Sequence, residues 1–572
     1  MKVGPSFSNN IYSPKTKSRS IESEPTQKPW LLFALLIGFL LFLSGRLFLL
    51  QIINGFSYRQ LSDVNRTKTI TIPAPRGIFT DRNGVPLVEN IASSASLLKN
   101  QIDPSAFLAQ RAYPYGSTFA HVLGYVGKIS ADDLNDPTYA GYTANNYVGR
   151  AGLEEYYESD LRGVDGRRLI EVNAQGNFIR VLGDADPIPG ATLQTTLDLK
   201  MQQAAVAAMR DVKKGAAVVS TPQGEILAIV SKPDYDPNLF SLGHQLPGAT
   251  VSAYPSVASI VRDNENQPLL DRAIAGLYPP GSTFKLIVAT GALEEHLIDA
   301  NFVVEDTGIL TLGGFSFANW YYTQYGKVDG LVNVVKAIQR SNDIFFYKVG
   351  SMLGADRIAA WATKFHLGQK TGIDLFGEAK GLVPTKEWKQ QVLHEDWYTG
   401  DDYHYGIGQG FLLVTPLQVN LYTQAIANNG TIYQPHLLLH TSPKVLATHI
   451  MQQSTIDLLR QGMIAVCSPG GVAWPLFNYS TNQQITGGLG DDYYELPSSA
   501  SAKPNSVGVR IACKTGTAEH GDTTQEPHAW ITVMAPAYHP QIIITVLSES
   551  SGEGSNVAGP IAKQILDAWF NK

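Results

Sequence analysis

The stretch LYPPGSTFK, residues 277–285, brings a chain breaker, a hydroxyl and an amine into close succession. Its two prolines and its glycine interrupt the preceding element and place Ser282 at a helix N-terminus, where the helix dipole favours developing negative charge. Ser282 and Lys285 then lie one helical turn apart on the same face, so that the amine can take the hydroxyl proton. The stretch therefore predicts a helix that begins with a nucleophilic serine.

The pattern Ser-x-x-Lys occurs twice in the chain, from Ser96 to Lys99 and from Ser282 to Lys285. A few chance matches are expected in a chain of 572 residues. Only the second copy follows strong breakers, so we interpret the copy at Ser96 as ordinary stalk sequence.

The triplet Lys-Thr-Gly also occurs twice, and only the later copy ends a predicted strand, SVGVRIACKTGTA at residues 506–518. On an edge strand its cation and hydroxyls can grip a carboxylate, and its glycine lets a substrate carbonyl or ring approach the backbone. The copy at residues 370–372 lies between a helix and a turn, and Gly372 is expected to stop that helix. The candidate clamp residues are therefore Lys514, Thr515, Gly516 and Thr517.

A third element, RSNDIFFYKVG at residues 340–350, follows a helix that is predicted to end at Ile338. Ser341 and Asp343 lie directly before its apolar aromatic run, although Ser-Asn-Asp alone is an ordinary capping sequence. The order of the three motifs favours a functional role over an ordinary cap. It is typical of serine β-lactamases and penicillin-binding proteins, in which Ser-x-x-Lys is followed by Ser-x-acid and then by Lys-Thr-Gly on a late strand. The sequence thus predicts acyl transfer through a serine ester.

One long apolar run, from Trp30 to Ile53, can cross a bilayer and is interrupted only by Arg46, which can snorkel from near one end. The run follows four lysines and an arginine, a positive flank that should stay in the cytoplasm, so the chain after Ile53 faces outward. No small-residue cleavage site follows, so we expect a retained anchor rather than a signal peptide or a buried core helix.

We expect an α+β protein whose late strands form an antiparallel sheet flanked by helices. The alternating run Thr67–Ile72 predicts a strand, and Asp81–Gly84 predicts a hairpin turn. Asp198 is a candidate N-cap for an Ala-rich helix that ends near Met209. The expected parts are a cytoplasmic tail (1–29), a transmembrane anchor (30–53), a β-rich membrane-proximal stalk (54–190) and a penicillin-binding (transpeptidase) domain (191–572).

Charge and cysteine content exclude several classes of protein. The formal net charge is -6 with a pI of about 6.1, so nothing in the overall balance suggests a nucleic acid as partner. The two cysteines, Cys467 and Cys513, cannot build a disulfide framework or a cysteine-rich zinc site. A bridge between them is possible, but we favour two buried free thiols.

Long ungapped blocks carry a family resemblance, namely residues 74–90, 149–163, 371–388 and 404–419, of which the first reads APRGIFTDRNGVPLVEN and the last HYGIGQGFLLVTPLQV. Together with the three motifs they resemble the class B penicillin-binding proteins, most of all elongation-type penicillin-binding protein 2, over nearly the whole chain. The resemblance implies that Ser282 is the nucleophile, Lys285 its general base and Ser341 a proton relay. It also implies that Lys514, Thr515 and Thr517 clamp the substrate.

The chain departs from the family pattern in two places. Asp343 stands where division-type relatives commonly carry Asn, which favours the elongation type; its charge would also make Lys285 a poorer base unless Ser341 mediates. The interval from Glu89 to His121 is short and implies a reduced head subdomain, where scaffold partners are thought to bind. Some relatives hold a metal near the second motif, but residues 301–350 contain no His or Cys, so we predict no metal and no cofactor.

The resemblance implies a peptidoglycan D,D-transpeptidase of the cell membrane, single-pass, with its N-terminus inside and its catalytic domain extracytoplasmic. The expected partners are stem peptides ending in D-Ala-D-Ala, β-lactams, the membrane, a SEDS-type glycan polymerase and scaffold proteins of the elongation complex. The alternative functions are a D,D-carboxypeptidase or β-lactamase, which hydrolyses the ester with water, and a non-catalytic β-lactam-binding scaffold or sensor. Intact Ser282, Lys285 and Lys514 argue against the sensor, and the anchor with its long stalk argues against a free-standing lactamase.

Overall fold

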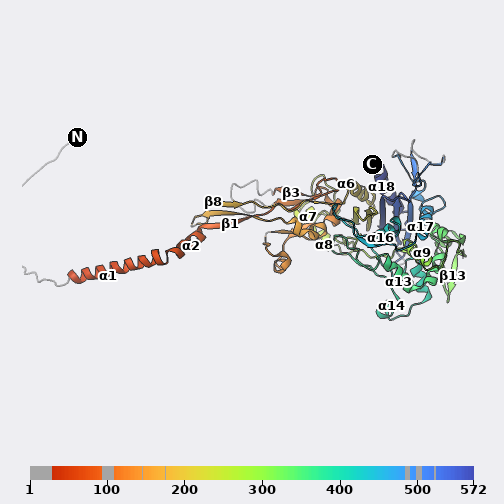
Figure 1. Cartoon of the computed structure of the whole chain (residues 1–572), viewed down its shortest axis with the longest axis horizontal. Helices are drawn as coiled ribbons and strands as arrows, with labels where there is room; N and C mark the ends of the chain where they lie inside the picture. The colour runs from red at the N-terminus through yellow and green to blue at the C-terminus, as the bar shows by residue number, and fades with distance from the viewer. Residues whose placement is uncertain are drawn as a thin grey trace, which may run out of the picture. The chain divides into compact units, whose positions relative to one another are not determined.

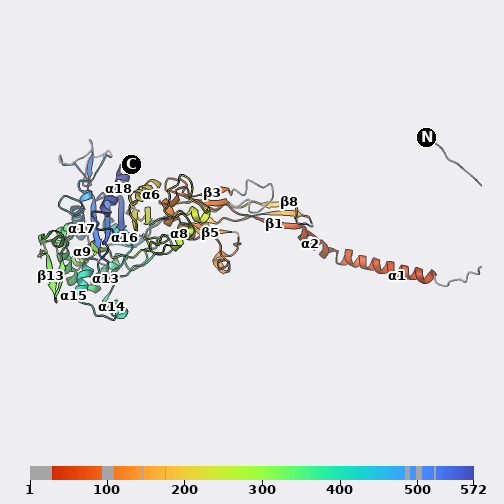
Figure 2. The same cartoon turned by 180° about the vertical axis from the view of Figure 1, so that it is seen from behind.

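The computed structural model of the chain describes residues 29–92, 109–144, 146–173, 175–482, 490–497, 506–520 and 524–571. The chain divides into two units, of which the first comprises the residues up to Ile70 with Arg167–Ala185, and the second Thr71–Gly166 with Asp186–Lys572. Figures 1 and 2 show both from opposite sides. Nearly all of the predicted tail, the pattern at Ser96 and much of the short head interval lie outside the described residues. The domain boundaries given above stay a prediction.

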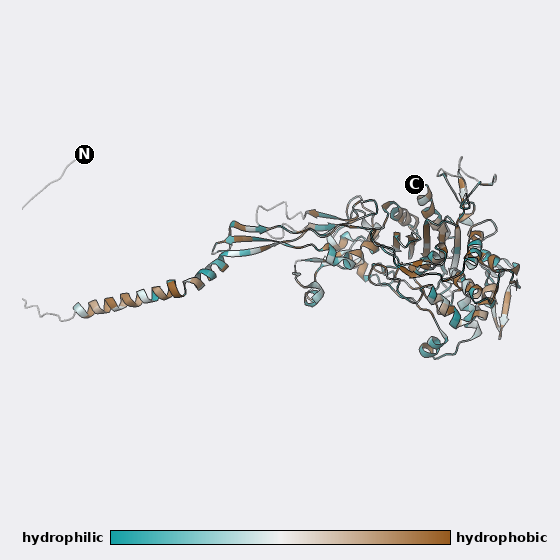
Figure 3. Ribbon diagram, in the orientation of Figure 1, coloured by the Kyte–Doolittle hydropathy of each residue, from teal (hydrophilic) through white to brown (hydrophobic). Residues whose placement is uncertain are grey.

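The first unit contains the apolar run as a helix. Helix α1, Pro29–Phe48, continues into a π-helical turn, Leu49–Ile53, and is followed by α2, Gly55–Arg66. Among the described residues, Pro29–Ile53 is the one helix long and apolar enough to cross a membrane; its mean hydropathy is 2.3 and none of it is buried inside the protein. Its brown colour sets it apart in Figure 3. The predicted single N-terminal apolar helix is confirmed.

A three-stranded sheet of order β1-β7-β8 continues the chain from this helix. Its strands are β1, Thr67–Ile72, as predicted from the alternating pattern, β7, Gly166–Val172, and β8, Phe178–Ala185. On β7, Glu171 accepts hydrogen bonds from Arg180 and Arg66, which lower the pKa of its carboxyl. These ion pairs tie α2 and β8 to β7.

Two of the sequence blocks of the stalk meet at a buried carboxylate. Glu154, on α4 (Gly152–Tyr156), has no exposed surface and accepts from Arg76 Nε at 2.7 Å and from Arg111 Nε at 2.6 Å. Burial alone would raise the pKa of Glu154, but the two guanidinium charges lower it below its ordinary value. Because removing one partner would leave buried charge unpaired, this ion cluster fixes the block at 74–90 against the block at 149–163.

The stalk residues of the second unit otherwise form short elements joined by turns. The predicted turn after β2 is present: Gly84 has a φ of +85° and its N–H donates to the Asp81 carbonyl at 3.0 Å. The pairs β3-β4 and β5-β6 are antiparallel and β2-β9 is parallel. The elements are β2 (Phe79–Thr80), β3 (Glu89–Ala92), β4 (Ala109–Ala112), α3 (Ala120–Leu123), β5 (Val126–Lys128), β6 (Tyr147–Gly149), α5 (Glu158–Leu161) and β9 (Leu193–Gln194).

A five-stranded antiparallel sheet of order β11-β10-β23-β22-β21 forms the centre of the second unit. The three inner strands, β10, β23 and β22, are buried along their whole length, as expected for a sheet covered on two faces. The predicted antiparallel sheet is confirmed, with β21 at one edge. The strands are β10 (Gly215–Ser220), β11 (Ile226–Lys232), β21 (Ala512–Ala518), β22 (His528–Ala535) and β23 (Ile542–Ser548).

Helices cover both faces of this sheet. Helices α6, Leu199–Ala208, and α18, Ala558–Phe570, contact each other, and between them they contact β11, β22 and β23. On the other face lie α16, Pro416–Ala427, which is buried throughout, and α17, Gln453–Val466. Asp198 caps α6 as predicted, because its side chain accepts from the third residue of the helix.

The second unit also contains further helices and several small two- and three-stranded sheets. The helices are α7 (Asn238–Ser241), α8 (Val257–Arg262), α9 (Lys285–Glu294), α10 (Trp320–Tyr325), α11 (Val334–Arg340), α12 (Asp343–Leu353), α13 (Ala355–Lys364), α14 (Lys386–Leu393) and α15 (Thr399–Gly406). The strands are β12 (Val304–Asp306), β13 (Ile309–Leu312), β14 (Phe315–Ala318), β15 (Gly330–Val332), β16 (Ile432–Tyr433), β17 (Val445–Ala447), β18 (Ser480–Thr481), β19 (Tyr493–Tyr494) and β20 (Val507–Val509).

The run SVGVRIAC, predicted as one strand, is divided between two sheets. β20 joins β18 and β19, whereas β21 joins the central sheet. At the break, the Arg510 N–H donates to the Asp492 carbonyl at 2.7 Å and its carbonyl accepts from the Ala537 N–H at 2.8 Å. These bonds turn the backbone out of one ladder before it enters the other.

Cys467 and Cys513 form a disulfide with a Cα–Cα distance of 6.0 Å, so the favoured interpretation of two free thiols is wrong. Cys467 is the residue after α17, and Cys513 lies on β21 directly before Lys514. Both side chains are buried. Only the packing of α17 against β21 brings together two cysteines that are 46 residues apart in sequence.

We expect the double variant Cys467→Ala/Cys513→Ala to lower the free energy of unfolding by about 2–4 kcal/mol, because the bridge restricts the unfolded chain. Thermal unfolding with and without a reductant measures this. The wild type should lose stability in reductant, while the double variant should not respond. Equal unfolding midpoints for the wild type in both conditions would contradict a bridge that stabilises the fold.

Candidate active site

The structure places Ser282 in a tight turn at the start of a helix. The 3-10 turn Gly281–Thr283 is followed, after Phe284, by α9, whose first residue is Lys285. Gly281 has a φ of +53°, a conformation that favours glycine, and its N–H donates to the Gly408 carbonyl at 2.9 Å. The Thr283 hydroxyl donates to the Pro280 carbonyl at 2.7 Å. Ser282 itself is half-buried, so the turn is held from both sides while its middle residue stays accessible.

Two glycines allow this nucleophile turn, Gly281–Thr283, to lie directly against β21. A Cβ on Gly516 would be 3.0 Å from the Pro280 carbonyl oxygen and 3.1 Å from Thr283 Cγ2, and a Cβ on Gly281 would be 2.7 Å from the Thr517 carbonyl oxygen. The close approach at Gly516 is therefore that of the protein's own turn. The approach of a substrate to Gly516 stays a prediction.

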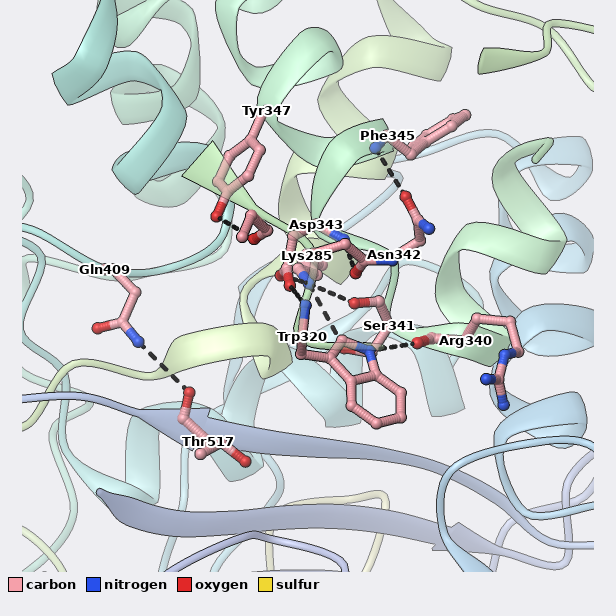
Figure 4. Close-up of polar contacts among 12 residues, drawn as sticks. Lys285, Trp320, Arg340, Ser341, Asn342, Asp343, Phe345, Tyr347, Gln409 and Thr517 are labelled. Atoms are coloured by element: carbon pink, nitrogen blue, oxygen red, sulfur yellow. Dashed lines mark hydrogen bonds and ion pairs between the residues drawn. The ribbon is translucent and has the colours of Figure 1, made fainter. Parts of the chain in front are cut away.

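The second motif lies in the sharp connection between α11 and α12. Ser341 ends α11 in the left-handed conformation, with φ +51° and ψ 38°, which is uncommon for a residue other than glycine. Asn342 is the N-cap of α12 and accepts from the Phe345 N–H at 2.9 Å, so its capping role is real. Asp343 is the first residue of α12. The reversal turns the side chains of Ser341 and Asp343 toward Lys285 (Figure 4).

The Lys285 ammonium has no exposed surface and three oxygen partners. Its Nζ donates to Asp343 Oδ1 at 2.6 Å, to the Ser341 carbonyl at 2.7 Å and to Ser341 Oγ at 3.4 Å. Figure 4 shows these contacts converging from α9 and from the α11–α12 connection. The first two motifs therefore meet through a buried ion pair.

The third motif reaches the same hydroxyl from the sheet. Lys514 Nζ donates to Ser341 Oγ at 2.9 Å and to the Thr515 carbonyl at 2.8 Å, and Lys514 is fully buried. Ser341 Oγ consequently lies between the ammonium groups of Lys514 and Lys285. Three stretches far apart in sequence are thus joined at one serine hydroxyl.

Burial controls the charge of both lysines. It lowers the pKa of Lys285 below its ordinary value, because the opposing effect of the Asp343 charge is smaller than the loss of solvation. Burial, together with the positive charge of Lys285, holds the pKa of Lys514 well below its ordinary value. Our concern that Asp343 would make Lys285 a poor base is therefore outweighed by desolvation.

The remaining predicted residues lie on the same stretch of β21. Thr515 is buried, and Thr517 is partly exposed beside the nucleophile turn. The Thr517 carbonyl accepts from Gln409 Nε2 at 3.3 Å (Figure 4), and its hydroxyl accepts from the Gly554 N–H at 3.5 Å. All eight predicted site residues therefore lie on the nucleophile turn, α9, the α11–α12 connection or β21.

Sequence reasoning missed Trp320, at the start of α10. Its backbone N–H donates to Asp343 Oδ2 at 2.9 Å, and its indole N–H donates to the Arg340 carbonyl at 2.9 Å. The contact with Asp343 comes from the backbone, so no residue type in the sequence could have indicated it. Both carboxylate oxygens of Asp343 are consequently engaged, one by Lys285 and one by α10.

The Lys-Thr-Gly triplet at residues 370–372 does not end a helix. The prediction that Gly372 stops a helix is therefore wrong. Helix α13 already ends at Lys364, and residues 370–372 lie in a loop. Glu378 holds this loop by accepting from the Thr371 N–H, the Thr371 hydroxyl and the Gly372 N–H at 2.5–3.0 Å. The triplet is not part of the strand that contacts Ser341.

The arrangement can activate a hydroxyl and bind an anion. Ser282 makes no hydrogen bond through its hydroxyl to any residue that the structure describes, and Lys285 follows it by one helical turn. In the described ranges, no group of three or more His, Cys, Asp or Glu side chains is placed to hold a metal ion. The absence of a metal stays a prediction. The groups present suit nucleophilic acyl transfer with a lysine base.

Two parts of the chain match models of known protein domains. Residues 215–567 match the penicillin-binding protein transpeptidase domain, and residues 105–195 match the penicillin-binding protein dimerisation domain. The peptidoglycan D,D-transpeptidase MrdA of Escherichia coli is 32% identical, over 92% of this chain and 91% of its own length.

Two solved structures are similar to most of the chain. Penicillin-binding protein 2 of Pseudomonas aeruginosa, in complex with WCK 5153, is 33% identical with a TM-score of 0.69, over 88% of this chain and 96% of its own. Penicillin-binding protein 2 of Helicobacter pylori, in complex with MreC, is 27% identical with a TM-score of 0.69, over 88% of this chain and 98% of its own length.

We expect Gly516→Ala to destabilise the second unit by about 1–3 kcal/mol, because its Cβ would press on the Pro280 carbonyl and on the side chains of Thr283 and Trp530. Thermal unfolding measures the change. Gly400→Ala is the matched control, since a Cβ there meets only one ring atom at 3.4 Å and the residue is helical. A Gly516→Ala variant as stable as Gly400→Ala would contradict the tight contact.

Proposed function

This chain belongs to the penicillin-binding protein transpeptidase family, and we propose that it is a membrane-anchored peptidoglycan D,D-transpeptidase that acts during cell-wall elongation. The observation that carries the proposal is the position of Ser341 Oγ, 2.9 Å from Lys514 Nζ and 3.4 Å from Lys285 Nζ. One hydroxyl then connects the base beside the nucleophile with the cation of the substrate-binding strand. The resemblance of the α11–α12 motif, with Asp343, to elongation-type members supports the elongation role.

In the first half of the proposed reaction, Ser282 attacks the carbonyl between the two terminal D-alanines of a donor stem peptide. Lys285 takes the hydroxyl proton, which the lowered pKa of its buried amine supports. Lys514, Thr515 and Thr517 bind the terminal carboxylate of the donor. Ser341 passes a proton between the two lysines and on to the leaving amine. D-Alanine departs, and the rest of the donor stays on Ser282 as an ester.

In the second half, the amine of a neighbouring stem peptide attacks this ester and forms the cross-link. The backbone N–H groups of Ser282 and Thr517 would hold the oxyanion in both steps, since they lie on the nucleophile turn and on β21, which contact each other. A β-lactam would mimic the donor and stop at the ester. A carboxypeptidase would hydrolyse the same ester with water. Cross-linked dimers among the products therefore distinguish a transpeptidase from a carboxypeptidase.

We also propose that the chain faces outward from the cytoplasmic membrane, with its N-terminus inside, because the positive residues precede the apolar helix. Its partners would be a SEDS-type glycan polymerase and scaffold proteins of the elongation complex. The similarity to a relative solved with MreC supports the scaffold partner.

Incubating the full-length protein in detergent with a labelled penicillin should give one covalent adduct by intact mass. Ser282→Ala should give none, because the attacking oxygen is gone. Ser96→Ala, in the other Ser-x-x-Lys pattern, is the matched control and should label like the wild type. A wild type without adduct, or an adduct that survives in Ser282→Ala, would reject the proposal.

Asp343→Asn should shift the pH dependence of acylation. The charge of Asp343 raises the pKa of Lys285, so its removal lowers that pKa further, and the neutral base becomes available at lower pH. The rise of the acylation rate constant with pH should therefore move to lower pH. Asp184→Asn, on β8, where Asp184 forms an exposed ion pair with Arg168 on β7, should leave the profile unchanged. A shift to higher pH in Asp343→Asn would contradict this role.

A further inference from the structure

Asp306, the last residue of β12, is almost fully buried, and its carboxylate accepts four hydrogen bonds. Only 2% of the residue is exposed. Its Oδ1 accepts from the Gly308 N–H at 2.8 Å. Its Oδ2 accepts from Asn319 Nδ2 at 2.8 Å, the Asp329 N–H at 2.9 Å and Asn342 Nδ2 at 2.9 Å. One carboxylate thus joins the segments that precede α10, β15 and α12.

A first path leads from Asp306 to the ion pair through Asn319. Asn319 is fully buried, and while its amide nitrogen donates to Asp306, its Oδ1 accepts from the Asp343 N–H at 3.2 Å. The next residue, Trp320, donates its backbone N–H to Asp343 Oδ2. Asn319 therefore places two groups against Asp343, whose other oxygen binds Lys285.

A second path leads through Asn342, which lies between Ser341 and Asp343 in the chain. Asn342 is fully buried; its oxygen caps α12 at Phe345, and its nitrogen donates to Asp306 and, at 3.1 Å, to Asp329 Oδ2. Figure 4 shows Asn342 pointing away from Lys285 while its two neighbours point toward it. Asp306 thus anchors the middle residue of a turn whose outer residues contact the two lysines.

We propose that Asp306 is a positioning residue of the acyl-transfer site: by holding Asn319 and Asn342 it fixes Asp343 and Ser341 against Lys285, and so sets the proton affinity of the base. The inference rests on the proposed function. Among the described residues, none of the four groups that bind Asp306 belongs to Ser282, Lys285 or Lys514. Asp306 therefore acts on these three residues indirectly, and the two asparagines provide the paths described above.

Asp306→Asn tests this with little change in size. Its amide keeps a single acceptor oxygen and turns a nitrogen toward a donor, which leaves a buried group unpaired and loosens the cluster. A small displacement of reacting groups is costly, so acylation by labelled penicillin should slow by about 10- to 100-fold. Because a loosened Asp343 raises the pKa of Lys285 less, the rise of the rate with pH should move to lower pH, as in Asp343→Asn.

Two comparisons separate positioning from a general loss of stability. Glu378→Gln is the matched control, since Glu378 is also a buried carboxylate that accepts three hydrogen bonds, in a loop that among the described residues makes no hydrogen bond to the α11–α12 connection. It should keep the wild-type rate and pH profile. The double variant Asp306→Asn/Asp343→Asn should show no shift beyond that of Asp343→Asn alone, because both changes act on one interaction.

An unchanged rate and pH profile in folded Asp306→Asn, or a double variant with additive shifts, would overturn the inference. If Asp306→Asn does not fold, Asn319→Ala cuts only the first path; the same shift to lower pH is then expected, and a wild-type profile overturns the inference. Failure of the proposed function can be distinguished from failure of this inference, because in the first case the wild type itself would form no adduct at Ser282.

Discussion

The candidate site depends on a lysine ammonium that is wholly removed from water. Burying the Lys285 charge is costly, and the Asp343 carboxylate and the two oxygens of Ser341 offset that cost only at close range and in one arrangement. The net effect is an amine whose pKa is lowered even though an anion lies 2.6 Å away. A serine nucleophile requires a base of this kind, an amine that can lose its proton and is held in a fixed position. The surrounding elements can be understood as the means of keeping these groups together.

Close backbone packing provides the second constraint. The nucleophile turn, Gly281–Thr283, lies against β21 because Gly281 and Gly516 carry no side chain, and a disulfide joins Cys513, next to Lys514, to the end of α17. The strand that carries the second lysine is therefore held by a covalent bond on one side and by the nucleophile turn on the other. Rigid supports of this kind let the lysines approach one hydroxyl without solvent between them.

Much of the fold could be predicted from local patterns. Period-two alternation and breaker residues predicted β1, the turn at Asp81–Gly84 and late strands that form an antiparallel sheet, because these features act over a few residues. The predictions failed where distant groups decide. The run before Lys514 is divided at Arg510 by hydrogen bonds to Asp492 and Ala537. The loop at residues 370–372 is shaped by Glu378 rather than by a helix end.

Local patterns were enough to predict the candidate reacting groups, since Ser282 and Lys285 are one helical turn apart and the order of the three motifs is readable along the chain. How those groups interact depends on the fold of the whole domain. The positions of Ser341 between two lysines, of the Trp320 N–H on Asp343 and of Asp306 behind them all arise from contacts between distant segments. Desolvation, which sets the charge of Lys285, depends on burial by the whole domain, and no local pattern of residues carries that information.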